Sequence, residues 1–156
     1  MRDYLKFYID GQWVDPVQPK QLDVINPATE EVAGHISIGS AADVDRAVKA
    51  ARRAFGTFGR SSKAERLALL DAIIAAYEAR SQDLADATRE EMGAPAWLAA
   101  GAHVPCALMH FTTARKLLED FDPDVSMGST KLTKEPIGVV GMITPWNWPL
   151  NQIACK

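Results

Sequence analysis

The chain has 156 residues, of which 47% are hydrophobic and 24% are charged, and this balance favours a globular protein over a disordered one. Its formal net charge of −3 and the lack of a basic block argue against nucleic-acid binding. No run approaches the roughly 18 apolar residues of a membrane span, and the charged N-terminus lacks the apolar centre of a secretory signal, so we expect a cytoplasmic protein with no membrane partner.

The N-terminal section is expected to form a β ribbon. Two β-prone runs within residues 6–14 flank Asp10-Gly11, a pair typical of tight hairpins. Two further short strands are expected at residues 22–25 and 31–38, with residues 26–29 (NPAT) as the turn between them.

The next section predicts two helices that begin at serine caps. Ser40 with Asp43 resembles a capping box, and Ser62 with Glu65 completes one. Gly56 and Gly59 are expected to end the first helix. Apolar side chains recur at helical spacing behind each cap, at Val44, Val48, Ala51 and Phe55 in the first helix and at Leu67, Leu70, Ile74 and Tyr77 in the second.

Two more helical stretches are expected before the C-terminal part of the chain. A third helix is predicted to begin at a Ser81 cap and to stop at residues 93–95 (GAP). A fourth stretch covers about residues 96–119. Pro105 is expected to kink or divide it, because proline lacks the amide donor that a helix interior needs.

The C-terminal part predicts the start of a βα unit. Residues 120–124 are expected to form a loop and residues 129–133 an exposed strand. Residues 137–143 (IGVVGMI) read as a buried strand of a parallel sheet, and residues 150–156 as the first turns of a helix. Such a strand needs neighbours and a complete crossover, so we expect the sequence to be incomplete relative to its fold.

The turn after this predicted strand holds one polar side chain between two prolines. In open α/β sheets, ligands bind beyond the carboxyl ends of strands, where residues 144–149 (TPWNWP) would lie. The Asn147 amide offers two uncharged N–H donors, and preorganised donors of this kind stabilise oxyanions. The alternative is that Asn147 only caps the following helix, since Asn is a favoured N-cap residue.

Residues 136–149 (PIGVVGMITPWNWP) resemble the signature of the aldehyde dehydrogenase superfamily, in which Pro-x-Gly and an apolar strand precede Pro-Trp-Asn-aromatic-Pro. Lys156, nine residues after Asn147, stands where that family has a lysine. Residues 26–31 (NPATEE) resemble another turn of the family. The resemblance implies an α/β fold with an N-terminal β ribbon, helices and the first strand of a Rossmann-like parallel sheet, incomplete in this chain.

The resemblance also implies the oxidation of an aldehyde to a carboxylic acid with NAD or NADP. In the family, a cysteine thiolate attacks the aldehyde to give a thiohemiacetal. Hydride then passes to the nicotinamide, and a water activated by a glutamate hydrolyses the thioester. The cysteine, the glutamate and the glycine-containing cofactor turn lie downstream in the family, so the chain alone is expected to be inactive.

Individual site residues follow from the same resemblance. Asn147 matches the oxyanion-hole asparagine, and Lys156 matches a lysine that supports proton relay around the glutamate. Trp148 matches an aromatic wall of the aldehyde tunnel. Gln152 matches a tunnel position that is often apolar, which points to a somewhat polar aldehyde. Four further residues match the family's segment that runs along the cofactor cleft beside the nicotinamide end. They are Ile143, Thr144, Pro145 and Trp146.

The domain boundaries implied by the resemblance divide the chain into three parts. Residues 1–123 would be the first part of the cofactor-binding domain, and residues 124–136 a ribbon used for oligomerisation. Residues 137–156 would begin the parallel sheet and the nicotinamide-side segment, with the catalytic domain absent. A homodimer or homotetramer is implied, and a plain edge hairpin is the alternative for the ribbon.

The cysteines are interpreted as structural residues and the histidines as structural or exposed ones. Cys106 and Cys155 form no CxxC pair, which argues against a disulfide framework or a zinc site, and each is read as a packed residue and not as the nucleophile. His35, His103 and His110 show no metal-ligand spacing with acidic or cysteine partners.

Two other functions stay open at this point. An acylating relative would pass the thioester to coenzyme A and would not need the glutamate. A non-catalytic interaction or structural protein could keep the same fold. Single residues also have simpler interpretations, because Lys156 could be a solvated helix residue and Trp146 and Trp148 could be plain core aromatics.

Overall fold

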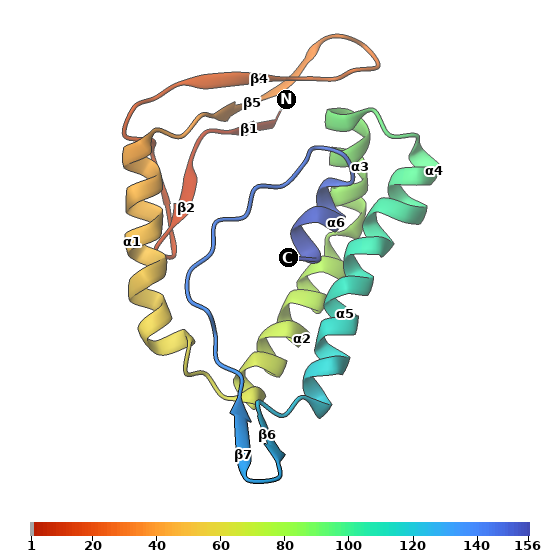
Figure 1. The fold of residues 1–156 in the computed structure, drawn as a ribbon. Helices are drawn as coiled ribbons and strands as arrows, with labels where there is room; N and C mark the ends of the chain where they lie inside the picture. Colours follow the sequence, from red (N-terminus) through yellow and green to blue (C-terminus); the bar gives the residue numbers. More distant parts are fainter. Residues whose placement is uncertain (1) are drawn as a thin grey trace.

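The computed structural model describes residues 2–156, which form strands, then helices, then a hairpin and a last short helix (Figure 1). The strands are β1 (Arg2–Tyr4), β2 (Phe7–Ile9), β3 (Gln12–Val14), β4 (Gln21–Ile25), β5 (Val32–Ser37), β6 (Asp124–Met127) and β7 (Thr130–Thr133). The helices are α1 (Ala41–Phe58), α2 (Lys63–Ala79), α3 (Ser81–Met92), α4 (Ala96–Leu98), the π-helix η1 (Ala99–His103), α5 (Val104–Asp120) and α6 (Pro149–Ala154).

The N-terminal strands confirm the predicted ribbon. β2 and β3 pair antiparallel across Asp10 and Gly11, which have φ values of 56° and 75°. Positive φ at both central residues is the geometry that an Asp-Gly hairpin turn supplies. β4 and β5 pair antiparallel on either side of the predicted turn, and β1 adds to β5 as a parallel strand, so the sheet has the order β1-β5-β4.

Helix α1 begins at the predicted cap and is capped at its end by Gly59, as predicted. The prediction that Gly56 also ends it is wrong, because Gly56 lies within the helix. The Ser40 amide donates to the Asp43 carboxylate at 2.9 Å, and the Val17 amide donates to the same carboxylate at 2.9 Å. These hydrogen bonds, that from the Ser40 amide first, lower the pKa of Asp43. The apolar side chains expected on one face of α1 are not all covered, because Val44 and Val48 are 59% and 47% exposed.

Helices α2 and α3 follow each other with little interruption. The Ser62–Glu65 capping box is confirmed, with the Glu65 amide donating to the Ser62 hydroxyl at 3.2 Å. The predicted Ser81 cap is wrong. Ser81 is already helical, and its hydroxyl donates to the Tyr77 carbonyl at 3.2 Å, so it closes the end of α2 instead. The end of α3 lies at Gly93, as predicted.

The fourth helical stretch is divided, as Pro105 predicts, but the division lies just before the proline. Residues Ala99–His103 form the π-helix η1, between α4 and α5. Proline has no backbone N–H, so it cannot donate to the carbonyl of the preceding turn. In a π turn the amides donate to carbonyls five residues earlier instead of four, so the backbone groups near the proline are paired differently. Here the Val104 amide donates to the Ala99 carbonyl.

The predicted buried strand at residues 137–143 is wrong for this chain. Among residues 2–156, none pairs with this segment, which is an extended stretch that leaves β7 and returns to α6 (Figure 1). Ile137 and Ile143 are 92% and 95% exposed. A strand is defined by hydrogen bonds to a neighbour, and the described residues supply none here. The exposed hairpin β6–β7 precedes the segment, and its β7 confirms the strand expected at residues 129–133.

The core lies where α3, η1, α5 and α6 meet, and it is built from small side chains. Its buried members are Ala85, Ala94, Ala99 and Val104. The side chains that pack around them are Tyr77, Leu84, Met92 and Leu150. Burial raises the pKa of Tyr77 to about 12, and its hydroxyl donates to the Val104 carbonyl at 3.0 Å. Within the described part of the chain, no helix is both long and apolar enough to cross a membrane.

Candidate functional site

Helix α6 is short but anchored, and it fixes the end of the loop that carries Asn147. Leu150 packs against the core described above. The side-chain oxygen of Asn151 accepts from Nε2 of His110 at 2.6 Å and from Sγ of Cys106 at 3.2 Å. A six-residue helix is too short to be stable alone, so these tertiary contacts with α5 hold it in place.

Trp148 has an unusual backbone conformation at the start of α6. Its φ and ψ are 58° and 52°, in the left-handed region that a bulky side chain rarely adopts. Its carbonyl accepts from the Gln152 amide at 3.0 Å, which closes the first turn of the helix. The indole stacks on the imidazole of His103, with ring centroids 4.2 Å apart and an interplanar angle of 14°.

His103 is the buried partner of this stack. It is 2% exposed, and burial lowers its pKa, because desolvation disfavours the charged imidazolium. Its Nδ1 has no hydrogen-bond partner among the described residues. A neutral imidazole therefore faces the indole. No group of three potential metal ligands occurs within residues 2–156, so His103 belongs to no metal cluster there.

Asn147 is exposed immediately before the stacked tryptophan. Within the described residues, no hydrogen bond holds its side-chain amide, and the residue that caps α6 is Trp148. The alternative that Asn147 merely caps this helix is thus wrong. Since Trp148 is fixed by its stack and by α6, the backbone beside Asn147 is restrained while the amide remains available to a ligand.

Gln152 and Lys156 lie one turn apart on the C-terminal side of α6. Nζ of Lys156 donates to Oε1 of Gln152 at 2.9 Å and also approaches the Gln152 carbonyl at 3.4 Å. Gln152 is half-buried and Lys156 is exposed. The structure therefore brings these two predicted site residues together, on and just after the short helix that follows Asn147 and Trp148.

The segment before Asn147 presents an uncharged surface. Thr144 and Pro145 are exposed, Ile143 is 95% exposed, and Trp146 is 78% exposed. Trp146 also borders a cavity of about 530 Å³ that lies between α3, α6 and the end of β4. Flat and branched apolar groups of this kind suit contact with the face of an aromatic ring.

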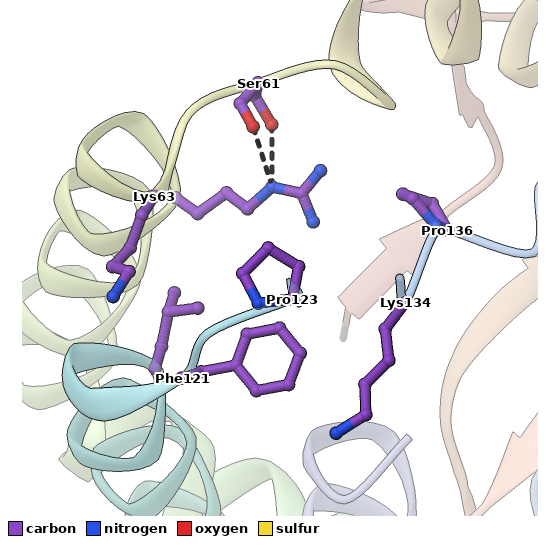
Figure 2. Close-up of a pocket in the computed structure, with 8 residues that line it drawn as sticks. Ser61, Lys63, Phe121, Pro123, Lys134 and Pro136 are labelled. Atoms are coloured by element: carbon purple, nitrogen blue, oxygen red, sulfur yellow. Dashed lines mark hydrogen bonds between the residues drawn. The ribbon is translucent and has the colours of Figure 1, made fainter. Parts of the chain in front are cut away.

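A separate cavity of about 220 Å³ lies at the base of the β6–β7 hairpin (Figure 2). Its basic side chains have neutral partners. Nε of Arg66 donates to the Ser61 hydroxyl at 2.9 Å, Nζ of Lys63 donates to the Glu119 carbonyl at 3.0 Å, and Nζ of Lys134 lies 5.3 Å from the Phe121 ring centroid. These contacts join α2, α5 and the hairpin, and they include none of the predicted site residues.

Sequence reasoning missed the residues that support the loop. The sequence alone predicts no site role for His103, Cys106, His110 or Asn151. Their contacts join segments distant in sequence, so no local pattern reveals them. Pro105 was the available signal, because it predicted a disturbed helix beside His103.

Comparison with known proteins places the chain in a family. Residues 13–156 match the model of the aldehyde dehydrogenase family. A 3-succinoylsemialdehyde-pyridine dehydrogenase from a Pseudomonas species is 53% identical over 157 aligned positions, which cover 100% of this chain and 33% of that protein. The chain thus spans about a third of the length of this relative.

Solved structures give the same result. An aldehyde dehydrogenase from Bartonella henselae superposes with a TM-score of 0.95 at 41% identity, covering 99% of this chain and 33% of that one. A mutant of aldehyde dehydrogenase C from Pseudomonas syringae, in complex with NAD+ and octanal, has a TM-score of 0.94 at 47% identity, covering 97% of this chain and 31% of that one. The mixed α/β fold of this chain is therefore part of a known architecture, and the chain belongs to the aldehyde dehydrogenase family.

Proposed function

We propose that the whole protein oxidises an aldehyde to a carboxylic acid with NAD+ or NADP+, and that this chain supplies its oxyanion-binding residue. The observation that carries the proposal is the Asn147 amide, which is exposed and beside a restrained Trp148. An uncharged donor held in this way stabilises the negative oxygen that forms when a nucleophile adds to a carbonyl. Membership of the aldehyde dehydrogenase family supports this chemistry.

The cofactor would lie along the segment that precedes Asn147. The residues that would hold its nicotinamide end are Ile143, Thr144, Pro145 and Trp146. Their exposed, uncharged surface fits an aromatic ring, and the similar Pseudomonas syringae enzyme binds NAD+. When bound, NAD+ or NADP+ accepts the hydride that leaves the aldehyde carbon.

The aldehyde would lie on the other side of Asn147, against α6. Trp148 provides an aromatic wall, and Gln152 a polar group. Lys156 donates to Gln152 and would keep a positive charge near the proton-transfer steps. The covalent step would use a cysteine thiolate from the remainder of the whole protein, giving a thiohemiacetal and then a thioester. A polar aldehyde is consistent with the pyridine-containing aldehyde named for the Pseudomonas relative.

The remaining assignments are also proposals. Residues 1–123 would begin the cofactor-binding domain, and residues 124–136 would contact a second subunit. Residues 137–156, which pair with no strand among residues 2–156, would join a parallel sheet only where the rest of the whole protein supplies the neighbouring strands. The β6–β7 hairpin supports the second assignment, because its side chains are exposed throughout. We propose a homodimer or homotetramer that works in the cytoplasm.

The test is aldehyde oxidation by the whole protein. Reduction of NAD+ and of NADP+ is followed at 340 nm with a panel of aliphatic, aromatic and semialdehyde substrates, each with and without coenzyme A. We expect turnover without coenzyme A and release of the free acid. Turnover that requires coenzyme A would favour the acylating alternative. Absence of turnover across the panel, in protein that is folded, would favour a non-catalytic role.

A further inference from the structure

We propose that His103 is a positioning residue, whose buried imidazole holds the Trp148 indole by stacking and so orients the adjacent Asn147 amide. The inference rests on the proposed function, since it concerns how the oxyanion donor is held. It begins from one contact, the parallel stack with ring centroids 4.2 Å apart.

Trp148 needs contacts with other residues to keep its conformation, because a bulky residue does not favour the left-handed backbone that it adopts. A residue with a large side chain at φ 58° and ψ 52° is strained, and Pro149 directly after it restricts it further. Strained residues persist where the surroundings determine their position, and they concentrate at functional sites. At Trp148 the surroundings are the α6 turn on the backbone side and His103 on the side-chain side.

His103 is suited to hold the indole in place, because its ring is flat and its own position is restrained. It is 2% exposed, and the next residue, Val104, is held through its carbonyl by the Tyr77 hydroxyl at 3.0 Å. The neutral imidazole presents a flat face without a buried charge. Within the described residues no hydrogen bond to Nδ1 turns the ring away from the indole.

The π-helix ends at His103, the residue that stacks on Trp148. A π turn contains one more residue than an α turn, so side chains beyond it are rotated by roughly 100° relative to a continuous α-helix. His103 is the last residue of η1 and lies two positions before Pro105. Two irregular backbone features, the end of η1 and the left-handed Trp148, therefore meet at a single stacking contact.

The catalytic test compares two variants of the whole protein, His103→Phe and His103→Leu. Both side chains are apolar and large enough to fill the buried site, but only Phe has a flat ring. We expect His103→Leu to lower kcat at least tenfold, with an unchanged Kd for NAD+, and His103→Phe to stay within about threefold of wild type. A role limited to stability would affect Leu and Phe alike, so equal kcat values for the two variants would overturn the proposal. Met109→Ala, at an exposed position on α5, is the control for effects of mutating the helix that directly follows His103.

A second measurement tests the contact without any turnover. The emission of Trp148 is obtained by subtracting the spectrum of Trp148→Phe from that of wild type, and the same subtraction is made in each His103 background. We expect faster anisotropy decay and a red-shifted Trp148 emission in His103→Leu, and recovery in His103→Phe. Unchanged Trp148 emission in His103→Leu would overturn the stack itself. A wild-type protein that oxidises no aldehyde but shows the expected emission changes would refute the proposed function and leave the contact standing.

Discussion

Nε2 of His110 lies 2.6 Å from the side-chain oxygen of Asn151, and this contact joins α5 to the helix that follows the Asn147 loop. The same oxygen accepts from Sγ of Cys106 at 3.2 Å. One amide oxygen thus satisfies two donors of a neighbouring helix. Helix α6, which carries Gln152 and precedes Lys156, is held to the protein by this pair of hydrogen bonds and by Leu150.

Replacing the acceptor should loosen α6. We expect Asn151→Leu to destabilise the whole protein by about 1–3 kcal/mol, because two partly buried donors lose their acceptor. Asn151→Asp keeps an oxygen acceptor and should lose less. Ile153→Ala, at a 59% exposed position of the same helix, is the control. Thermal unfolding measures the differences, and equal midpoints for Asn151→Leu and Ile153→Ala would contradict this role.

Removing the proposed oxyanion donor should affect the reaction and not the fold. We expect Asn147→Ala to lower kcat by about a hundredfold or more, the usual consequence of losing one such donor. The unfolding midpoint should stay near that of wild type, because the amide makes no hydrogen bond within the described residues. Steady-state kinetics and NAD+ titration provide the measurement. Near-normal turnover would refute the assignment of Asn147.

Local signals predicted most of the fold, and their success has a physical reason. The Asp10-Gly11 turn, the Ser62–Glu65 box and the Gly93 stop depend on backbone conformations and hydrogen bonds made within a few residues. The prediction for Ser81 is wrong because a serine hydroxyl can bond either at the start of one helix or at the end of the helix before it. In this chain its hydroxyl bonds backward to Tyr77.

Features that depend on distant partners were predicted incompletely. Residues 137–143 have the composition of a buried strand, yet a strand also needs a neighbour to pair with, and none is present among residues 2–156. At the site, the family resemblance predicts roles for Asn147 and Trp148, and these stay predictions. It gave no indication of His103, because a stacking contact depends on how two helices pack and on the extra residue of a π turn.

Adding a methyl group at Gly93 should destabilise the junction between the β ribbon and α3. Gly93 has φ 74°, and a Cβ there would lie 2.6 Å from Cγ of Pro27. We expect Gly93→Ala to cost about 1–2 kcal/mol from the left-handed backbone, with the contact adding to it. Gly101→Ala is the matched control, since a Cβ at that position meets nothing within 4 Å. The two variants are compared by denaturant unfolding. Equal free energies of unfolding for Gly93→Ala and Gly101→Ala would show that the turn at Pro27 can move away from the added methyl group without loss of stability.

Burial of His103 predicts a specific acid sensitivity of the folded protein. The folded state lowers the pKa of His103 below its ordinary value of 6.5, so the unfolded chain binds a proton more readily than the folded one. Above pH 6.5 the imidazole is mostly neutral in both states, so its titration does not change the free energy of unfolding. As the pH falls below it, protonation of the unfolded chain draws the equilibrium toward unfolding, until the pH reaches the lowered pKa of the folded state.

His103→Phe removes this titration and keeps a flat ring in the site. We expect the unfolding midpoint of wild type to fall further than that of His103→Phe between about pH 7 and pH 5, because only wild type has a buried imidazole that resists protonation. His35 and His110 are present in both proteins, so their contributions cancel in the comparison. Parallel pH profiles for the two proteins would mean that the imidazole of His103 accepts a proton as easily in the folded state as in the unfolded one, and would contradict its burial as a neutral ring.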